Sequence, residues 1–185
     1  VLSNMGTIYY ERGNFKMALE YYLKALAYKE ALGQMNGVAS LRCNIGNIYI
    51  NQNQYEQARS HYQQAQEMFV KVGNRMGISY THNNLGVIYE ESGDLEKAIQ
   101  SYRESLKIDT ELGDKFGMAS ANFNLGEIHV KTNQLALAQA YYEKALQYAQ
   151  EIANPSQIAS AIMGQARIAR ITGKTSESIK LSQTA

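Results

Sequence analysis

The amino-acid sequence repeats itself every 40 residues, and this periodicity constrains the fold more strongly than any other feature. Similar stretches begin at Ser3, Cys43, Asn83 and Phe123, and a degraded fifth copy begins at Met163. Sequence repeats of roughly this length are single supersecondary units that bury their apolar faces only against neighbouring units. The sequence therefore predicts a row of stacked units rather than a globule built around one core.

Two positions in each copy hold residues that are typical of helix ends. The first position reads Gly13, Asn53, Gly93, Asn133 and Gly173, and the second reads Gly33, Gly73, Gly113 and Ala153. Glycine and asparagine tolerate the left-handed backbone conformation that ends a helix. After Ala153, Asn154 can cap a new helix and Pro155 suits its first position. Each copy is thus predicted to form a helix, a tight turn and a second helix of about five turns.

Other positions are restricted to small or apolar residues. The first helix of each copy carries a small residue (Gly6, Gly46, Gly86, Gly126, Ala166) and an isoleucine that we expect to be buried (Ile8, Ile48, Ile88, Ile128, Ile168). The second helix carries an alanine (Ala18, Ala58, Ala98, Ala138) and, four residues later, a tyrosine (Tyr22, Tyr62, Tyr102, Tyr142). Residues four apart share one helix face. We therefore expect the small residue to let paired helices approach closely opposite the alanine.

Together these positions resemble the tetratricopeptide repeat. The pattern L-G-x-x-Y ahead of a helix end, followed by A-x-x-x-Y, is carried by Leu85, Gly86, Tyr89, Gly93, Ala98 and Tyr102. The period of 40 residues is similar to the long-repeat branch found in spindle-orientation scaffolds, kinesin light chains and bacterial signalling proteins. The resemblance implies an all-α fold, an α-solenoid in which antiparallel helix pairs stack into a right-handed superhelix. It also implies a protein-binding scaffold with a concave groove lined by the first helices.

The repeat boundaries follow from the same pattern. One domain is expected over residues 1–185, with repeats at 1–36, 37–76, 77–116 and 117–155 and a capping pair of helices at 156–185. The last copy fits an end cap because Ser182 replaces the tyrosine and Gln165 replaces an apolar residue. The chain has no initiator methionine and its first copy is truncated, which indicates a fragment of a longer protein.

The first helices carry asparagines in register, two residues before the small position. The asparagine row consists of Asn4, Asn44, Asn84 and Asn124, with Gly164 in the last copy. A side-chain amide both donates and accepts, so this row can pair with the main chain of an extended peptide without reading its sequence. In the long-repeat scaffolds that the chain resembles, asparagines at this position bind the ligand backbone. The alternative is that these asparagines cap or connect neighbouring helices.

Helical spacing places further candidate contact residues on the same face. They are Asn47, Tyr80, Asn83, Glu90, Phe123, Glu127, Arg167 and Arg170. Acidic residues lie at the centre of this face and basic residues lie toward its C-terminal end. A peptide ligand is therefore expected to carry a basic residue in its middle and an acidic residue toward the last repeat, with apolar anchors between them. The alternative is an ordinary solvated helix face.

Composition argues against several other classes of partner. The 18 basic and 17 acidic residues give a formal net charge of +1, which favours neither nucleic acid nor an anionic membrane. The sequence contains no run of about 18 apolar residues, so it predicts no membrane-spanning helix. The single cysteine, Cys43, cannot form an internal disulfide and suits a reducing compartment, so we expect a cytoplasmic location.

Residues that carry catalysis are few. His61 is expected to be exposed, and His129 replaces a packing tyrosine. Cys43 and His82 alone do not make a zinc site, and the sequence contains no glycine-rich phosphate loop. We therefore expect no enzymatic activity, no metal and no cofactor.

Two functional hypotheses remain open. The first is an autonomous scaffold that binds a protein or peptide in its groove. The second is a regulatory or sensor module of a larger signalling protein, such as a kinase, a cyclase or a transcription regulator. A chaperone-tail ligand is not expected, because the positions of the clamp lysines in chaperone-adaptor domains hold Ser3 or Cys43 and Tyr80 or Ser120. Ligand identity and oligomeric state do not follow from the sequence.

Overall fold

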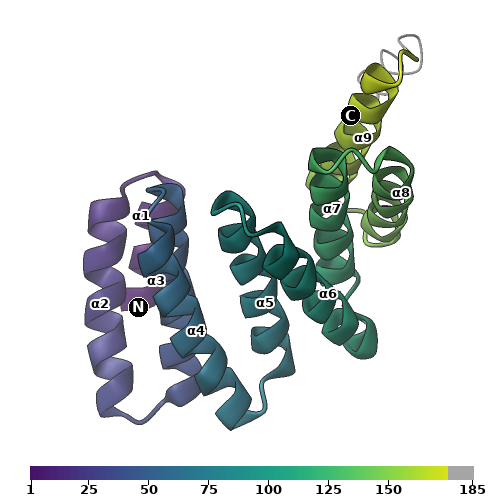
Figure 1. Ribbon diagram of the computed structural model, residues 1–185. Helices are drawn as coiled ribbons and strands as arrows, with labels where there is room; N and C mark the ends of the chain where they lie inside the picture. The colour runs from purple at the N-terminus through teal and green to yellow at the C-terminus, as the bar shows by residue number, and fades with distance from the viewer. Residues whose placement is uncertain (175–185) are drawn as a thin grey trace. The chain divides into compact units, whose positions relative to one another are not determined.

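Helices are the only regular secondary structure in the computed structural model over residues 1–174, the part of the chain that it describes (Figure 1). The chain falls into two compact units that divide between Ser92 and Gly93. The first unit contains α1 (Leu2–Glu11), α2 (Phe15–Ala31), α3 (Met35–Asn51), α4 (Tyr55–Val72) and α5 (Arg75–Glu91). The second contains α6 (Leu95–Leu112), α7 (Lys115–Lys131), α8 (Leu135–Glu151) and α9 (Pro155–Ile171). The second helix of the predicted capping pair lies outside the described residues.

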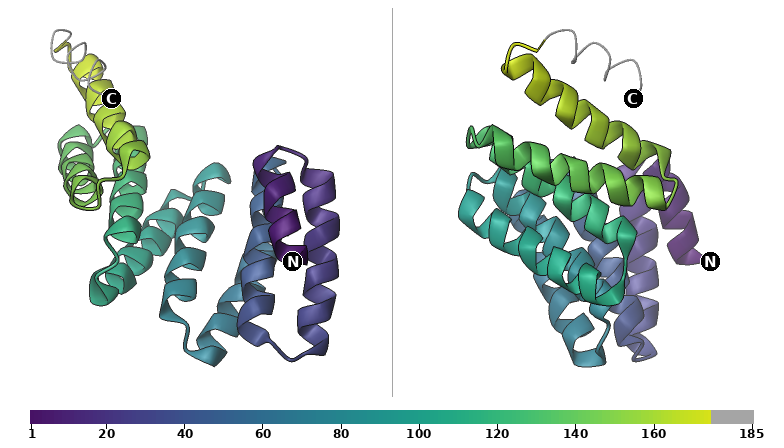
Figure 2. Two further views of the ribbon diagram at one scale, coloured as in Figure 1. Left: turned by 180° about the vertical axis from the view of Figure 1, so that it is seen from behind. Right: turned by 90° about the vertical axis from the view of Figure 1, so that its right-hand side faces the viewer.

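Helix hairpins are the building blocks of each unit. In the first unit α1 pairs with α2 and α3 pairs with α4, and in the second unit α7 pairs with α8 (Figure 1). Each hairpin also stacks on the next element of its unit. The helix pairs that make these contacts are α2 and α3, α4 and α5, α6 and α7, and α8 and α9. Figure 2 shows α9 lying next to α8 at the end of the second unit. This stacking confirms the predicted all-α solenoid class.

Backbone conformation confirms the predicted helix ends. The residues of the first turn position (Gly13, Asn53, Gly93, Asn133, Gly173) have positive φ angles of 57° to 82°. Those of the second position also have positive φ, including 49° at Ala153. Asn154 Oδ1 accepts a hydrogen bond from Gln157 N at 3.1 Å, and Pro155 begins α9. The helices therefore end at the glycine, asparagine and alanine residues at which the sequence predicted helix ends.

Ala153 has a left-handed backbone conformation, which its Cβ atom disfavours. The side chain is exposed, so its removal sacrifices little packing. We expect Ala153→Gly to raise the free energy of unfolding by about 1 kcal/mol, measured by urea denaturation. The reciprocal variant Gly113→Ala, at the corresponding turn with φ 69°, should lower the free energy of unfolding by a similar amount. Equal stability of wild type and both variants would contradict this account.

The small residue of the first helix lies against the tyrosine of the second helix. A Cβ atom added to Gly6 would lie 2.5 Å from the ring of Tyr22, and one added to Gly46 would lie 2.7 Å from the ring of Tyr62. Both tyrosines are buried. In these two repeats the aromatic ring occupies the space next to the bare backbone of the glycine.

Four of the five repeated isoleucines are buried, as predicted. Ile48, Ile88, Ile128 and Ile168 are at most 7% exposed, whereas Ile8 is 42% exposed. Ile48 belongs to a core cluster that includes Ala18 and Tyr22 of the preceding repeat. Within residues 1–174, no cluster that corresponds to the one around Ile48 covers Ile8 on α1. The expectation of burial is thus wrong for Ile8.

Candidate functional site

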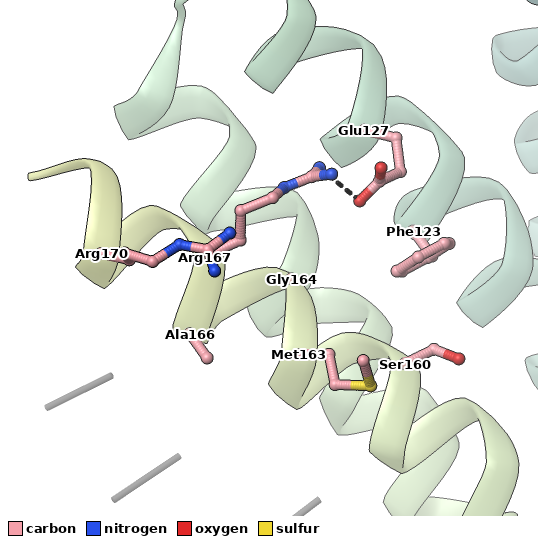
Figure 3. Close-up of a pocket in the computed structure, with 8 residues that line it drawn as sticks. All are labelled: Phe123, Glu127, Ser160, Met163, Gly164, Ala166, Arg167 and Arg170. Atoms are coloured by element: carbon pink, nitrogen blue, oxygen red, sulfur yellow. Dashed lines mark hydrogen bonds and ion pairs between the residues drawn. The ribbon is translucent and has the colours of Figure 1, made fainter. Parts of the chain in front are cut away.

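Hollows lie between the first helices of consecutive repeats in both units. In the first unit, a hollow of about 210 Å³ lies between α1 and α3, and another of about 290 Å³ lies between α3 and α5. In the second unit, a hollow of about 400 Å³ lies between α7 and α9 (Figure 3). These helices are the elements that the sequence predicts to line a binding groove.

Asn44 occupies the central position of this surface in the first unit. Its side chain lines the hollow that contains Thr7 and Tyr10 of α1, and also the hollow that contains Met76 and Tyr80 of α5. The residue is half-buried. Among residues 1–174 its amide group has no hydrogen-bond partner. An amide in this position has a donor and an acceptor free to pair with another chain.

The other members of the asparagine row have different surroundings. Asn4 is exposed on α1, whereas Asn84 on α5 and Asn124 on α7 are half-buried. Asn84 Nδ2 donates a hydrogen bond to the carbonyl oxygen of Tyr80 in its own helix at 2.8 Å. Asn84 is therefore bonded within its own helix rather than to a neighbouring one. Ligand contact by the row remains a prediction.

A second polar row, one residue after the small position, contacts the buried tyrosine hydroxyls. The Thr7 hydroxyl oxygen lies 3.2 Å from that of Tyr22, and the Tyr62 hydroxyl donates to Asn47 Oδ1. Asn47 Nδ2 in turn donates to the Tyr80 hydroxyl oxygen at 3.0 Å, which brings two predicted contact residues together. Burial raises the pKa of Tyr62 and of Tyr80. These phenols therefore stay protonated at neutral pH.

Four predicted site residues come together in the hollow of the second unit: Phe123 and Glu127 on α7, and Arg167 and Arg170 on α9 (Figure 3). Arg167 Nη2 donates to Glu127 Oε1 at 2.6 Å and to the hydroxyl oxygen of Tyr142 at 2.9 Å. The Tyr142 hydroxyl donates to the same carboxylate oxygen. The rings of Phe123 and Tyr142 pack with their centroids 5.7 Å apart. Phe123 and the ion pair are thus held by one buried tyrosine.

The ion pair changes the charge expected on this face. Burial opposes the charged form of Arg167, but the hydrogen bond to Glu127 and the charge of that carboxylate raise the pKa of the guanidinium overall. Burial, followed by the hydrogen bond to Glu127, raises the pKa of Tyr142, which stays neutral. Glu127 and Arg167 neutralise each other, so the expectation that they present separate charges to a ligand is corrected. Arg170 is exposed and makes no ion pair within the described residues.

Two other predicted residues lie outside the hollows of the first unit. Asn83 and Glu90 are half-buried on α5 and do not line the hollow between α3 and α5. Sequence reasoning in turn missed Phe69 and Met76, which line that hollow. Met76 is 63% exposed. Its signal in the sequence is an apolar residue one turn before Tyr80, near the start of a first helix.

Two residue types capable of catalysis, a histidine and the cysteine, are at least half-buried in the described part of the chain. His61 is half-buried rather than exposed, and its ring stacks on Tyr49 with the centroids 5.4 Å apart. Burial raises the pKa of Cys43 to about 12, so its thiol is neutral and weakly nucleophilic at neutral pH. Within residues 1–174, no three His, Cys, Asp or Glu side chains are grouped so that they could hold a metal ion. No helix in the described part of the chain is both long and apolar enough to cross a membrane.

Three family models described as tetratricopeptide repeat match the sequence. They match residues 1–32, 37–111 and 119–152, which together make up most of the chain. No curated protein matches the sequence as a relative.

Several solved structures have a similar fold. BtubC (BKLC) from P. vanneervenii superimposes with a TM-score of 0.83 at 19% sequence identity, over 99% of this chain and 76% of that protein. Aspartyl phosphate phosphatase F from Bacillus subtilis has a TM-score of 0.87 at 20% identity, over 97% of this chain and 46% of that protein. A signal transduction ATPase with a tetratricopeptide repeat sensor, from Pyrococcus horikoshii, has a TM-score of 0.76 at 23% identity, over 89% of this chain and 26% of that protein. The chain thus spans less than half of the last two proteins, and at these identities the likeness concerns the fold alone.

Proposed function

The chain belongs to the tetratricopeptide repeat proteins, and from this premise we propose that it binds an extended peptide segment of a partner protein. In each compact unit the binding surface is the face formed by the first helices of its repeats. The free amide of Asn44, placed between two hollows, is the observation that carries the proposal.

An extended peptide complements this arrangement. Its main chain offers one N–H donor and one carbonyl acceptor per residue, and the Asn44 amide can pair with both kinds of group. Successive side chains of an extended strand point to opposite sides. One side chain can then enter the hollow between α1 and α3, and another can enter the more apolar hollow between α3 and α5, which Phe69 and Met76 line. The asparagine thus supplies affinity, and the hollows supply side-chain selectivity.

A peptide-display experiment tests the proposal. Random peptides of twelve residues are selected on the immobilised chain, and the selected peptides are labelled for fluorescence anisotropy. We expect Asn44→Ala to weaken binding about tenfold, because two hydrogen bonds to the peptide main chain are lost. The effect should be similar for peptides of different sequence, since the contact is to the main chain.

Gln63→Ala is the matched control, because Gln63 is an exposed amide residue on the second helix α4, outside the hollows described above. This variant should bind every selected peptide as the wild type does. Unchanged affinity of Asn44→Ala would contradict the role of the asparagine. Failure to select any peptide that binds would contradict the proposed function itself.

The alternative function is a regulatory or sensor module of a larger signalling protein, such as a kinase, a cyclase or a transcription regulator. The Pyrococcus horikoshii ATPase, whose tetratricopeptide repeat segment is described as a sensor, supports this alternative by analogy. The full-length sequence distinguishes the two functions. A kinase, cyclase or DNA-binding domain in the same polypeptide favours the sensor module, and a polypeptide without an output domain favours the scaffold.

We extend the proposal to the absence of catalysis and to a cytoplasmic location. The buried, neutral thiol of Cys43 and the stacked ring of His61 support a non-enzymatic surface. The near-zero net charge supports a peptide rather than a nucleic acid or membrane partner. A phosphatase assay on the isolated chain provides a direct test, because one of the similar folds belongs to an aspartyl phosphate phosphatase.

A further inference from the structure

The hollow between α7 and α9 has an excess of positive charge. Three charged residues line it: Glu127, Arg167 and Arg170. Glu127 and Arg167 form an ion pair at 2.6 Å, so their charges cancel locally. The exposed guanidinium of Arg170 has no carboxylate partner within the described residues. Arginine in this state pairs readily with a carboxylate, because its planar fork of N–H donors matches two carboxylate oxygens.

Arg167 also keeps part of its hydrogen-bonding capacity. Its bonds to Glu127 and to the Tyr142 hydroxyl both use Nη2. Its Nε atom is buried and has no hydrogen-bond partner. A second acceptor near the two arginines would therefore satisfy donors that the protein leaves unused.

Apolar groups form the rest of the hollow. Phe123 packs on Tyr142 at one wall, and Met163 stands at the rim with 63% of its surface exposed (Figure 3). The backbone of Gly164 forms part of the wall. A larger residue would not fit there, because an added Cβ atom would lie 2.6 Å from the ring of Tyr142. The volume of about 400 Å³ accommodates an apolar side chain together with a short polar one. A flexible methionine at the rim can adapt to side chains of different shape.

We propose that the hollow between α7 and α9 binds an acidic side chain of the partner peptide, together with an apolar side chain adjacent to it. The acidic group pairs with Arg170, and the apolar group lies between Phe123 and Met163. This inference rests on the proposed peptide-binding function and specifies the chemistry that a peptide bound to the second unit carries. A side chain is favoured over a terminal carboxylate because Arg170 is exposed and lines the hollow on the face along which we propose that the extended peptide runs.

Substitutions of the two charged residues have opposite expected effects. Arg170→Gln removes the unpaired positive charge and should weaken binding of an acidic probe about fivefold. Glu127→Gln removes the negative charge that neutralises Arg167, so it should strengthen binding of the same probe by a similar factor. Arg170→Lys keeps the charge and should retain most of the affinity. A merely structural role for these residues would weaken binding in all three variants.

Short blocked peptides are the probes. Acetyl-Leu-Glu-amide carries the proposed side chains, acetyl-Leu-Gln-amide lacks the charge, and acetyl-Leu-Gln with a free C-terminus carries its charge on the main chain. Binding is followed by the ¹³C-methyl NMR signal of Met163, with Met76 in the other unit as the reference signal. Lys144→Gln, which removes an exposed positive charge from α8, is the matched control for nonspecific charge effects.

The expected result is that acetyl-Leu-Glu-amide shifts the Met163 methyl signal in a saturable way. The affinity for acetyl-Leu-Gln-amide, derived from the same signal, should be at least about fivefold lower. Equal affinity for these two probes overturns the inference, and so does selective binding of the probe with the free C-terminus. Failure of Glu127→Gln and Arg170→Gln to act in opposite directions also overturns it. If display-selected peptides still bind through Asn44 in that case, the proposed function stands and only the acidic specificity fails.

Discussion

Replacing Gly46 with alanine is expected to lower the free energy of unfolding by about 1–2 kcal/mol, although alanine is the better helix former by about 1 kcal/mol. The new Cβ atom would lie 2.7 Å from the ring of Tyr62, which is fully buried and donates a hydrogen bond to Asn47. Because the ring is fully buried and hydrogen-bonded, any movement of it disturbs its neighbours, so overpacking outweighs the gain in helix propensity. Urea denaturation followed by circular dichroism measures the change.

Gly37→Ala, in the same helix, is the matched control. A Cβ atom at Gly37 would meet the end of the Lys29 side chain at 2.7 Å, and this flexible group can move away. That variant should therefore be neutral or stabilising by up to about 1 kcal/mol. Loss of stability in Gly37→Ala equal to that in Gly46→Ala would indicate that alanine is disfavoured throughout α3 for another reason.

A double substitution isolates the contact with the tyrosine ring. Tyr62→Ala alone should cost about 3–5 kcal/mol, since it removes a fully buried aromatic side chain. In the Tyr62→Ala background, Gly46→Ala should change sign and stabilise the protein, because the group that it clashes with is gone. The sequence contains a parallel: the copy with Ala166 at the small position is also the copy with Ser182 at the tyrosine position. A cycle in which the two substitutions are additive would contradict the close contact.

The repeat pattern predicted most of the fold because one molecule contains several versions of each structural position. Helix ends at Asn53 and Asn133 were identifiable because glycine occupies the same position in other copies. Burial of Ile48 followed from its repetition, whereas exposure of Ile8 depended on whether a neighbour covers α1. Repetition thus predicts local structure well, but it does not predict exceptions that depend on which neighbour covers a helix.

The site was less predictable because its properties depend on contacts between helices. Helical spacing placed Glu127 and Arg167 on one face, but it did not reveal that they pair at 2.6 Å and so neutralise each other. The free amide of Asn44 was likewise indistinguishable by pattern from that of Asn84, which bonds to its own helix. Met76 was missed because its position is not apolar in every copy. Charge and hydrogen-bond state at the site therefore required the three-dimensional structure.

His129 is expected to make the stability of the protein depend on pH. It occupies the position that holds tyrosine in the first three copies, and its ring stacks on Tyr141 with the centroids 5.3 Å apart. Only 4% of the residue is exposed, so the imidazole is largely removed from water. Burial lowers the pKa of His129 overall, opposed by the side chain of Gln134 and reinforced by the charge of Arg103. The folded protein therefore resists protonation of this imidazole more than the unfolded chain does.

The sign of the effect follows from that difference. The unfolded chain takes up a proton near its ordinary pKa of about 6.5, so the stability contributed by neutral His129 is complete above that pH. It is lost as the pH falls from about 6.5 toward the lower pKa of the folded state. Between pH 7.5 and 5.5 the free energy of unfolding should therefore decrease, by at most about 1.4 kcal/mol per pH unit for each such histidine. Urea denaturation at several pH values in this range measures the slope.

His129→Tyr restores the residue of the first three copies and should reduce this slope while it preserves the stacked ring pair. His61 is the appropriate comparison, because its pKa is also lowered by burial and it stacks on Tyr49 in the other unit. His61→Tyr should remove a separate part of the pH dependence of the free energy of unfolding. The double variant should remove most of this pH dependence. The carboxylates of Asp94 and Glu151, whose pKa values are lowered by their lysine partners, titrate well below this window. An unchanged slope in the double variant would show that the two buried imidazoles do not control acid sensitivity, and it would place the titrating groups elsewhere in the chain.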